Sequence, residues 1–290
     1  MAAAAWPIER HGSWDSFAAK AAHWVADAAA NNAELLVFPE YGSMELTALL
    51  PHGGDLHESL RELQELFPLY RDLWEGLAAR SGVVIVAPSF PVAESGTYLN
   101  QAWVFASGGR CTHQSKLHMT RFEDELWGIS AGRGLQILDF GVAKAAVAIC
   151  YDVEFPAQVR ALTAAGADLI LVPSCTDTDA GFTRVSVSAR ARAIENQCFV
   201  VQSTTVGEAP WSPAVDINIG AAGAYCPADR GFPSDGILAQ GAMNEPGWVY
   251  ADLDFEALDA VRAAGQVLNL RDYRDQDYGT PATADLRRNP

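Results

Sequence analysis

Cys150 stands at a point in the sequence where a thiol could act as a nucleophile. It follows the apolar segment 144–149 and precedes the segment 151–156, whose Pro156 suits the first turn of a helix. A thiol at such a strand-to-helix turn lies near the positive end of a helix, which stabilises a thiolate, and the Tyr151 amide beside it can donate to an oxyanion. The sequence therefore predicts a nucleophile, with a buried structural cysteine as the alternative.

Glu40 and Lys116 are two further candidates for a site with Cys150. Glu40 ends the run Leu35-Leu-Val-Phe-Pro-Glu40, and open α/β sheets place their sites at the carboxyl ends of strands. A carboxylate there can take the thiol proton, and a fixed cation such as Lys116 can stabilise the negative oxygen that forms. Alternatively, Glu40 is an exposed loop carboxylate and Lys116 a solvated lysine.

The elements that must position these residues alternate along the chain in the manner of an α/β fold. Apolar or β-branched runs predict buried strands at 35–38, 83–86, 102–105, 146–149, 169–172 and 199–202. Segments of helical period predict helices at 14–28 with Ser13 as the cap, at 60–77, at 156–166 and at 184–197. Because no repeat or Pro/Ser-rich linker divides the chain, we expect one domain over 1–290, with the polar segment 265–290 as a C-terminal arm.

Composition limits the classes of partner that the chain can be expected to bind and the cellular compartment in which it is expected. With 290 residues, 49% of them hydrophobic, the chain can bury a large core, and its net charge of -16 disfavours nucleic acid or an anionic membrane as a partner. The N-terminus lacks the features of a secretory signal, and no apolar run approaches the ~18 residues that span a bilayer, so we expect a cytoplasmic protein. The five cysteines show neither disulfide nor zinc-site spacing, and we expect no metal and no cofactor.

Three segments around the candidate residues resemble the signatures of one enzyme superfamily. Phe38-Pro-Glu40, Lys116-Leu-His118 and Ile149-Cys-Tyr-Asp152 occur in the order and at the spacing typical of the nitrilase superfamily of carbon–nitrogen hydrolases, and the likeness continues through 165–174 and 190–196. The resemblance implies an α-β-β-α sandwich. It also implies a homodimer or a higher homo-oligomer, in which two sandwiches form an α-β-β-α-α-β-β-α unit and the C-terminal arm lies at the subunit interface.

The resemblance also implies a mechanism. Glu40 is then the general base, Lys116 stabilises the oxyanion, and Cys150 forms a thioester that water hydrolyses to an acid after ammonia or an amine departs. Family members carry a second glutamate beside the site, seven residues before a glycine that Gly132 matches. This spacing selects Glu125, whereas Glu123 remains the alternative.

The residues after Cys150 indicate the branch of the superfamily and the type of substrate. Cys150-Tyr151-Asp152 resembles amidases, whereas true nitrilases tend to carry Cys-Trp-Glu. Glu154 stands where several members that act on carboxylate-bearing substrates have an arginine, which favours a neutral or amine-bearing small-molecule amide. The chain looks closest to a subgroup whose members are sometimes fused to an acetyltransferase-like domain. Candidate substrate-binding residues are Tyr41, Glu154, Thr176, Phe182 and Trp211.

Three other functions stay open at this point. A nitrilase or an acyltransferase could use the same Glu40, Lys116 and Cys150, and a non-catalytic scaffold could keep the fold. The intact set of acid, lysine and thiol argues against the scaffold, because a scaffold has no physical need for it.

Overall fold

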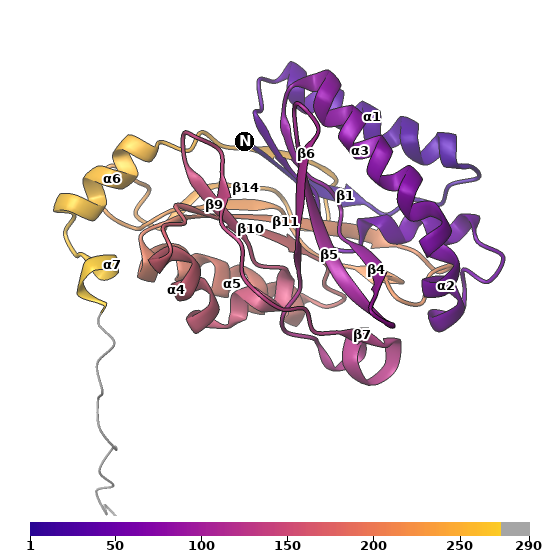
Figure 1. Cartoon of the computed structure of the whole chain (residues 1–290). Helices are drawn as coiled ribbons and strands as arrows, with labels where there is room; N and C mark the ends of the chain where they lie inside the picture. The colour runs from indigo at the N-terminus through magenta and orange to yellow at the C-terminus, as the bar shows by residue number, and fades with distance from the viewer. Residues whose placement is uncertain (274–290) are drawn as a thin grey trace, which may run out of the picture.

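In the computed structural model, which describes residues 1–273, the predicted strands form part of a curled sheet that lies between two helical layers (Figure 1). Helices α1 (Trp14–Ala30) and α3 (Phe67–Ser81) cover one face of the strands. Helices α4 (Pro156–Ala164) and α5 (Asp179–Asn196) cover the other face. The α/β fold class and the layered nitrilase-type arrangement are thus confirmed.

The remaining elements complete these layers. The other helices are α2 (Leu56–Leu63), α6 (Phe255–Ala264) and α7 (Asn269–Asp272), with short 3₁₀ or π turns at η1 (Gly42–Leu49), η2 (Gln64–Leu66), η3 (Phe122–Trp127) and η4 (Cys150–Glu154). The strands are β1 (Ala2–Pro7), β2 (Leu35–Val37), β3 (Val84–Val86), β4 (Phe90–Glu94), β5 (Thr97–Ala106), β6 (Arg110–Ser115), β7 (Ile129–Ser130), β8 (Leu138–Asp139), β9 (Lys144–Val147), β10 (Leu169–Ser174), β11 (Phe199–Glu208), β12 (Ile217–Asn218), β13 (Gly223–Tyr225), β14 (Ile237–Gln240) and β15 (Gly247–Tyr250).

Two of the helix predictions differ from the structure at their boundaries. The apolar stripe 60–77 belongs to two helices, α2 and α3, because Pro68 starts a new helix in its first turn instead of continuing the old one. Helix α5 begins at Asp179, five residues before the predicted start, where the Thr178 hydroxyl accepts a hydrogen bond from the Gly181 amide at 3.1 Å. The cap at Ser13 is present as predicted, with the Ser16 amide as its donor.

The N-terminal segment forms a central strand that the sequence did not reveal. β1 pairs in parallel with β2 and with β11, and its alanines are buried on both faces. Ala2, Ala4 and Trp6 pack toward the core below α1 and α3, whereas Ala3 and Ala5 pack toward the core below α4 and α5. Alanine has high helix propensity and no β-branch, so only the two packed layers make this segment a strand.

The curl of the sheet brings distant strand ends together. The parallel strands run in the order β2-β1-β11-β10-β9, so β2 and β9 would lie roughly 19 Å apart in a flat sheet, at ~4.8 Å per neighbour. Glu40 follows β2 and Cys150 follows β9, yet both contact Cys175, which follows β10. Curvature is therefore what places the two predicted reactive groups in one site.

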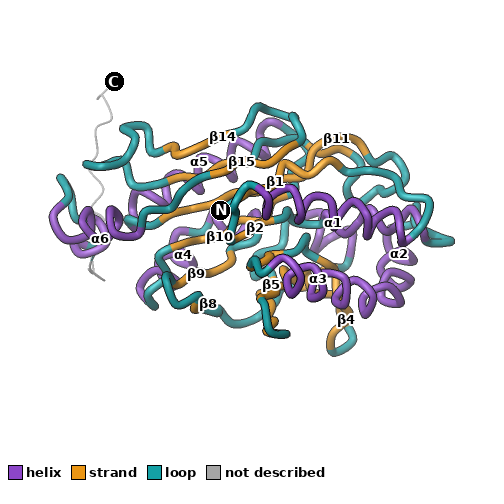
Figure 2. The backbone as a smooth tube through the Cα atoms, turned by 90° about the horizontal axis from the view of Figure 1, so that it is seen from above, coloured by secondary structure: helices purple, strands orange, loops and turns teal. Residues whose placement is uncertain are grey.

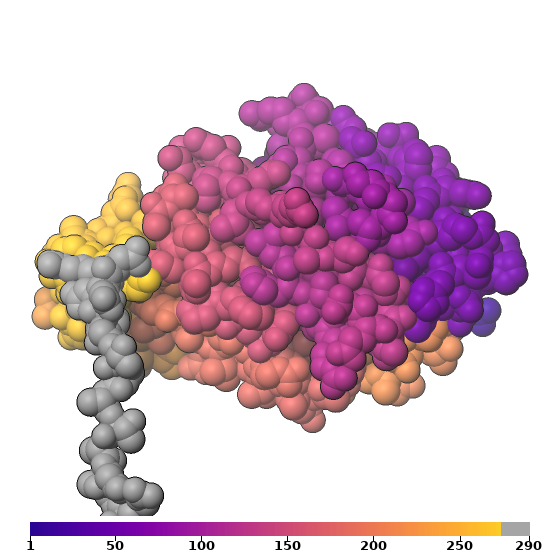
Figure 3. Space-filling view, turned by 60° about the horizontal axis from the view of Figure 1, so that its bottom comes forward, coloured from indigo at the N-terminus to yellow at the C-terminus, as the bar shows by residue number. Residues whose placement is uncertain are grey.

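The C-terminal elements lie at the end of the molecule away from the N-terminal helices. α6 lies there in Figures 1 and 2, α7 lies on the same side in Figure 1, and the yellow end of the described chain lies there in Figure 3. The first residues of the predicted arm pack on their own chain, because the Gln266 amide donates to Asp229 at 2.9 Å and the Leu270 amide to Gln197 at 3.1 Å. The rest of the arm, 274–290, lies outside the described residues. Within residues 1–273 no helix is both long and apolar enough to cross a membrane.

Gly132 permits a close approach that fixes the Lys116 segment. The Lys116 amide donates to the Asn100 carbonyl at 2.8 Å, and the Gly132 amide donates to the Lys116 carbonyl at 2.7 Å. A Cβ at Gly132 would lie 2.4 Å from the Ser115 Cβ and 2.9 Å from the Lys116 carbonyl oxygen. Glycine is therefore required here for space.

Gly132→Ala should lower the free energy of unfolding by about 1–3 kcal/mol, because the backbone of residues 115 and 116 must move to make room for the methyl group. Urea unfolding of the purified variants measures this. Gly12→Ala is the matched control, because no atom lies within 4 Å of a Cβ built there. Equal stability of the two variants would contradict the packing argument.

Candidate active site

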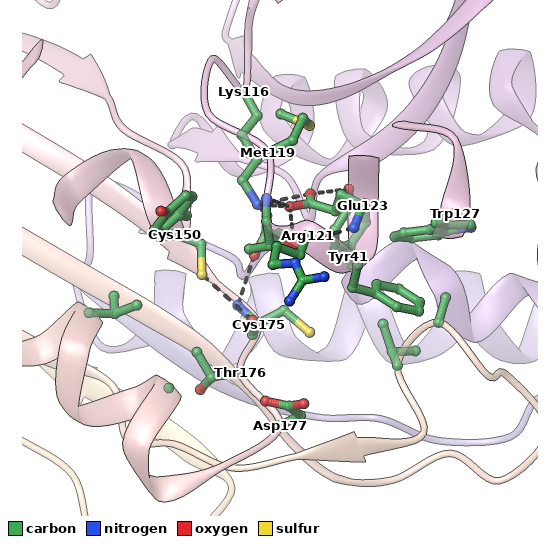
Figure 4. Close-up of a pocket in the computed structure, with 18 of the residues that line it drawn as sticks. Tyr41, Lys116, Met119, Arg121, Glu123, Trp127, Cys150, Cys175, Thr176 and Asp177 are labelled. Carbon is green, nitrogen blue, oxygen red and sulfur yellow. Dashed lines mark hydrogen bonds and ion pairs between the residues drawn. The ribbon is translucent and has the colours of Figure 1, made fainter. Parts of the chain in front are cut away.

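The structure brings Glu40, Lys116 and Cys150 into one site (Figure 4). The Lys116 Nζ lies 2.8 Å from Glu40 Oε1. The Cys175 backbone links the acid to the thiol, because its amide donates to Glu40 Oε2 at 3.1 Å and its carbonyl lies 3.6 Å from Cys150 Sγ. The three residues that were selected from separate segments of the sequence are thus within reach of one another.

Cys150 holds a backbone conformation that turns its side chain out of the strand. Its φ is 47°, in the left-handed region that residues other than glycine seldom adopt, at a cost of about 1–3 kcal/mol. The Asp152 amide closes the first turn of η4 by donating to the Ile149 carbonyl, so the Cys150 and Tyr151 amides precede the first hydrogen bond of that turn. Tyr151 also lines the pocket, in the position from which its amide was predicted to donate.

The glutamate that lies beside Lys116 is Glu123, so the prediction that Glu125 lies in the site is wrong. Both carboxylate oxygens of Glu123 contact Lys116 Nζ, at 2.7 and 2.8 Å, and its side chain is 3% exposed. The Glu125 side chain is 48% exposed and pairs with Arg121 through two hydrogen bonds.

Local backbone geometry explains this outcome. The segment that carries both glutamates is a π-helix, η3, so a count of residues back from Gly132 does not identify the side that faces Lys116. Glu123 is fixed there by the Tyr41 hydroxyl at 2.7 Å and by the amide and hydroxyl of Thr120 at 2.9 and 2.8 Å.

Asp152 joins the lysine segment to the cysteine turn, a role that the sequence did not reveal. It is fully buried and accepts hydrogen bonds from the amides of Leu117 and His118 and from the His118 ring at 3.0 Å. The Ile149 amide, just before Cys150, donates to the same carboxylate at 3.3 Å. The aspartate of the Cys-Tyr-Asp motif therefore holds Lys116 and Cys150 in register.

Asn100 also positions Glu40, through the oxygen that Lys116 contacts. Its side-chain amide donates to Glu40 Oε1 at 2.9 Å, while its backbone carbonyl accepts from the Lys116 amide. Asn100 is fully buried in β5. An isolated asparagine in a strand gives no sequence signal of this kind, because the contact depends on pairing between β5 and β6.

Burial and neighbouring charges set the ionisation of the site. Burial raises the pKa of Glu40 from an ordinary 4.5 to about 7; Lys116 acts to lower this pKa, and Glu123 to raise it further. Burial would also raise the pKa of Glu123, but Lys116 and the hydrogen bonds from Thr120 and Tyr41 outweigh it and lower the pKa. Both glutamates keep Lys116 charged, so its pKa rises well above the ordinary value although burial acts to lower it.

The expected stabilisation of a Cys150 thiolate is wrong for the resting site. Burial, followed by the charge of Glu40, raises the pKa of the Cys150 thiol well above its ordinary value. The element that begins at Cys150 is a short 3₁₀ turn, and α4 starts only at Pro156, so little helix dipole acts on the sulfur. The thiol is therefore protonated until a base removes its proton.

A pocket of about 700 Å³ opens in front of these groups. Three of the predicted substrate-binding residues line it, namely Tyr41, Glu154 and Thr176. Residues that the sequence analysis did not select also line it, among them Met119, Arg121, Phe122, Trp127, Cys175, Asp177, Arg184 and Asp216. The volume lies in the range of sites for small organic ligands.

Phe182 and Trp211 lie outside the pocket, contrary to prediction. Helix α5 presents Gly181, Arg184 and Val185 to the cavity, which is one face at helical spacing, so Phe182 lies on another face and is buried. In the turn before β12, residues 213–217 line the cavity, whereas Trp211 packs against the core below α1 and α3. Among residues 1–273 no group of three or more His, Cys, Asp or Glu is arranged to hold a metal ion; the expected lack of a metal or cofactor stays a prediction.

Comparison with known proteins assigns the family. The family described as "Carbon-nitrogen hydrolase" matches residues 2–263, so the chain belongs to the carbon–nitrogen hydrolase family, and the resemblance to the nitrilase superfamily is confirmed.

Individual relatives support this assignment of the family. The chain is 35% identical to a probable hydrolase, YhcX, of Bacillus subtilis over 92% of this chain; it spans 52% of that relative, about half its length. It is 30% identical to a 2-oxoglutaramate amidase of Paenarthrobacter nicotinovorans, over 82% of this chain and 78% of the relative. A solved mutant of the amidase from Nesterenkonia sp. AN1, which shows Michael addition of acrylamide at the active site cysteine, has the same fold with a TM-score of 0.69. Its identity is 23%, over 90% of this chain and 96% of that chain.

Glu123→Gln should lower kcat/KM for an amide by at least about 10²-fold, because loss of the Glu123 charge lets the Lys116 ammonium move away from its position beside Glu40. Ammonia release measures this, with a thermal melt to verify folding. The matched variant Glu125→Gln removes the same charge two residues away, at the exposed surface, and should change kcat/KM by no more than about twofold. A greater loss in Glu125→Gln than in Glu123→Gln would contradict the placement.

Proposed function

We propose that this carbon–nitrogen hydrolase is an amidase that converts a non-peptide, linear amide to a carboxylic acid and ammonia or an amine through a thioester on Cys150. The observation that carries the proposal is the buried arrangement of a thiol, a carboxyl group of pKa about 7 and a charged lysine at the inner end of one pocket. A base with a pKa near neutrality suits the removal of a thiol proton at physiological pH.

In the first step, Glu40 takes the Cys150 proton and the sulfur attacks the amide carbon. The tetrahedral oxyanion is stabilised by Lys116 and by the Tyr151 amide. A lysine has three N–H donors; one is directed at Glu40, one suffices for Glu123, and the third can serve the oxyanion. Glu123 does not transfer protons in this mechanism. It holds the cation in place and keeps it charged.

In the second step, the tetrahedral species collapses and the carbon–nitrogen bond breaks. The nitrogen takes the proton held by Glu40 and leaves as ammonia or an amine. Water then enters, Glu40 accepts one of its protons, and hydroxide attack on the thioester releases the acid and restores the thiol. Glu40 returns that proton to the departing Cys150 sulfur, so one carboxyl group acts in turn as base, acid, base and acid again.

Cys150, and not Cys175, is assigned as the nucleophile although both line the pocket. The Cys175 thiol donates to Asn218 Oδ1 at 3.4 Å. Cys175 contributes its backbone instead, through the amide that binds Glu40. The Nesterenkonia amidase, in which acrylamide adds at the active site cysteine, supports a thiol as the nucleophile, and the 2-oxoglutaramate amidase supports an amidase activity.

The remaining expectations stay predictions from the sequence. These are a cytoplasmic homodimer with the C-terminal arm at its interface, membership of the subgroup that is sometimes fused to an acetyltransferase-like domain, and the three alternatives of nitrilase, acyltransferase and non-catalytic scaffold. The buried acid, lysine and thiol favour hydrolysis of an amide over the scaffold.

Cys150→Ala should abolish release of ammonia or amine from every substrate in a panel of amides, carbamoyl compounds and nitriles, because the proposed thioester forms on the Cys150 sulfur. The exposed cysteine variant Cys111→Ala should keep full activity. Amide turnover that persists in Cys150→Ala would refute the thioester mechanism, and turnover of nitriles alone would favour the nitrilase alternative.

The pH dependence of kcat/KM should follow the ionisation of Glu40. Its carboxylate form is required, so kcat/KM should be level above pH 7 and should fall about tenfold per unit of pH below it. Glu40→Gln should lower kcat/KM by at least about 10²-fold and remove this inflection. An inflection near the ordinary pKa of a glutamate, 4.5, would contradict the role of burial.

A further inference from the structure

The outer part of the pocket carries more negative than positive charge. Beyond Glu40, Lys116 and Glu123, three carboxylates line the cavity: Glu154, Asp177 and Asp216. Two arginines, Arg121 and Arg184, line it as well. The type of ligand that this wall prefers depends on which of these charges are already paired.

Both arginines are engaged. Arg121 forms two hydrogen bonds to Glu125, at 2.7 and 2.8 Å, in the bidentate geometry that a substrate carboxylate would otherwise take. Arg184 directs its Nε at Glu154 Oε1, 3.6 Å away. An anionic substrate must therefore compete with a carboxylate of the protein at either arginine.

The carboxylates are less fully satisfied. Within residues 1–273, neither Asp177 nor Asp216 forms an ion pair; Asp177 accepts from the Thr178 hydroxyl at 3.3 Å, and Asp216 from the Ile217 amide at 3.0 Å. The contact between Glu154 and Arg184 is longer than an ordinary hydrogen bond. Burial raises the pKa of Glu154 in spite of Arg184, so a second cation would stabilise its charged form.

The wall that carries these charges faces the nucleophile. Glu154 is at the end of η4, the turn that Cys150 begins, and Asp177 follows Cys175 by two residues. Figure 4 shows Asp177 and Thr176 below the two cysteines, on the side away from Lys116. The N-terminus of α5, which would attract an anion, already carries Asp179 in its first turn and Asp177 just before it.

Aromatic residues line the same cavity. Tyr41 and Phe122 both pack against Trp127, with ring centroids 4.7 and 5.7 Å apart, and all three residues line the cavity. Such a wall can hold the methylene groups of a chain, and aromatic faces also attract cations.

On these grounds, and resting on the proposed amidase function, we propose that the substrate is an amide with a positively charged amino group at its far end, which Glu154, Asp177 and Asp216 bind while Cys150 attacks the amide carbon. The overall charge of -16 adds a long-range field that draws such a cation toward the protein. A primary ammonium offers three donors to these oxygens.

Three amides of nearly equal size and shape test the charge preference: 4-aminobutanamide, which is cationic, pentanamide, which is neutral, and succinamate, which is anionic. We expect kcat/KM for 4-aminobutanamide to exceed that for pentanamide at least about tenfold and succinamate to be the poorest substrate. Equal values for all three, or a preference for succinamate, would overturn the proposal while leaving the amidase function intact.

Variants identify the residues responsible. Glu154→Gln, and the double variant Asp177→Asn with Asp216→Asn, should each raise KM for 4-aminobutanamide about fivefold with little change in kcat, and should raise KM for pentanamide less, because pentanamide has no charge for these carboxylates to bind. Asp124→Asn, an exposed charge change on η3 outside the cavity, is the matched control. An unchanged KM for the cation in both pocket variants would contradict the assignment.

Binding to Cys150→Ala separates this proposal from the proposed function. In calorimetry, 4-aminobutanamide should bind this variant more tightly than pentanamide, and succinamate least. Tight binding of the cation without turnover by the native protein would support the site and count against the amidase. Tightest binding by succinamate would assign Arg184 or Arg121 as the recognition group and overturn the proposal.

Discussion

The architecture of the site depends on one buried ammonium group held between two buried carboxylates. Removing a charged side chain from water costs several kcal/mol, and a buried pair that loses one partner is destabilised by about 3–5 kcal/mol. Lys116 is 1% exposed and binds Glu40 on one side and Glu123 on the other, so the three side chains keep one another ionisable inside the protein. Burial raises the pKa of Glu40 to about 7, and Glu123, which shares the same cation, acts to raise it further, although Lys116 acts to lower it. The contacts among Glu40, Lys116 and Glu123 therefore both stabilise the buried charges and help to set the pKa that the proposed base needs.

The surrounding residues serve to hold this triad in place. Asp152 ties the lysine segment to the cysteine turn, Asn100 and the Cys175 amide direct the Glu40 carboxylate, and Gly132 lets the chain pass close to Lys116. Each contact joins segments that are separated in the sequence. The fold thus provides rigid attachment points, as a site with a buried charge network needs.

Much of this arrangement could be predicted from the sequence because it depends on local sequence patterns. Apolar runs that end at Glu40 and Cys150 predicted both the strands and the candidate reactive groups, and the three motifs predicted the family. The sequence did not give what depends on tertiary geometry. The alanine segment 2–5 is a strand only because both of its faces are covered, the π-helix η3 turns Glu123 and not Glu125 toward Lys116, and the start of α5 at Asp179 places Phe182 outside the pocket. The protonated state of Cys150 likewise follows from burial, which no motif records.

The central claim is that the chain performs its chemistry through an acyl group on Cys150. Peptide mass spectrometry of the protein, quenched in acid during turnover of an amide, tests it most directly. The account predicts a mass increase equal to that of the acyl group on the peptide that contains Cys150, which hydroxylamine removes. Turnover with no adduct on any cysteine, or an adduct on Cys175 alone, would contradict it.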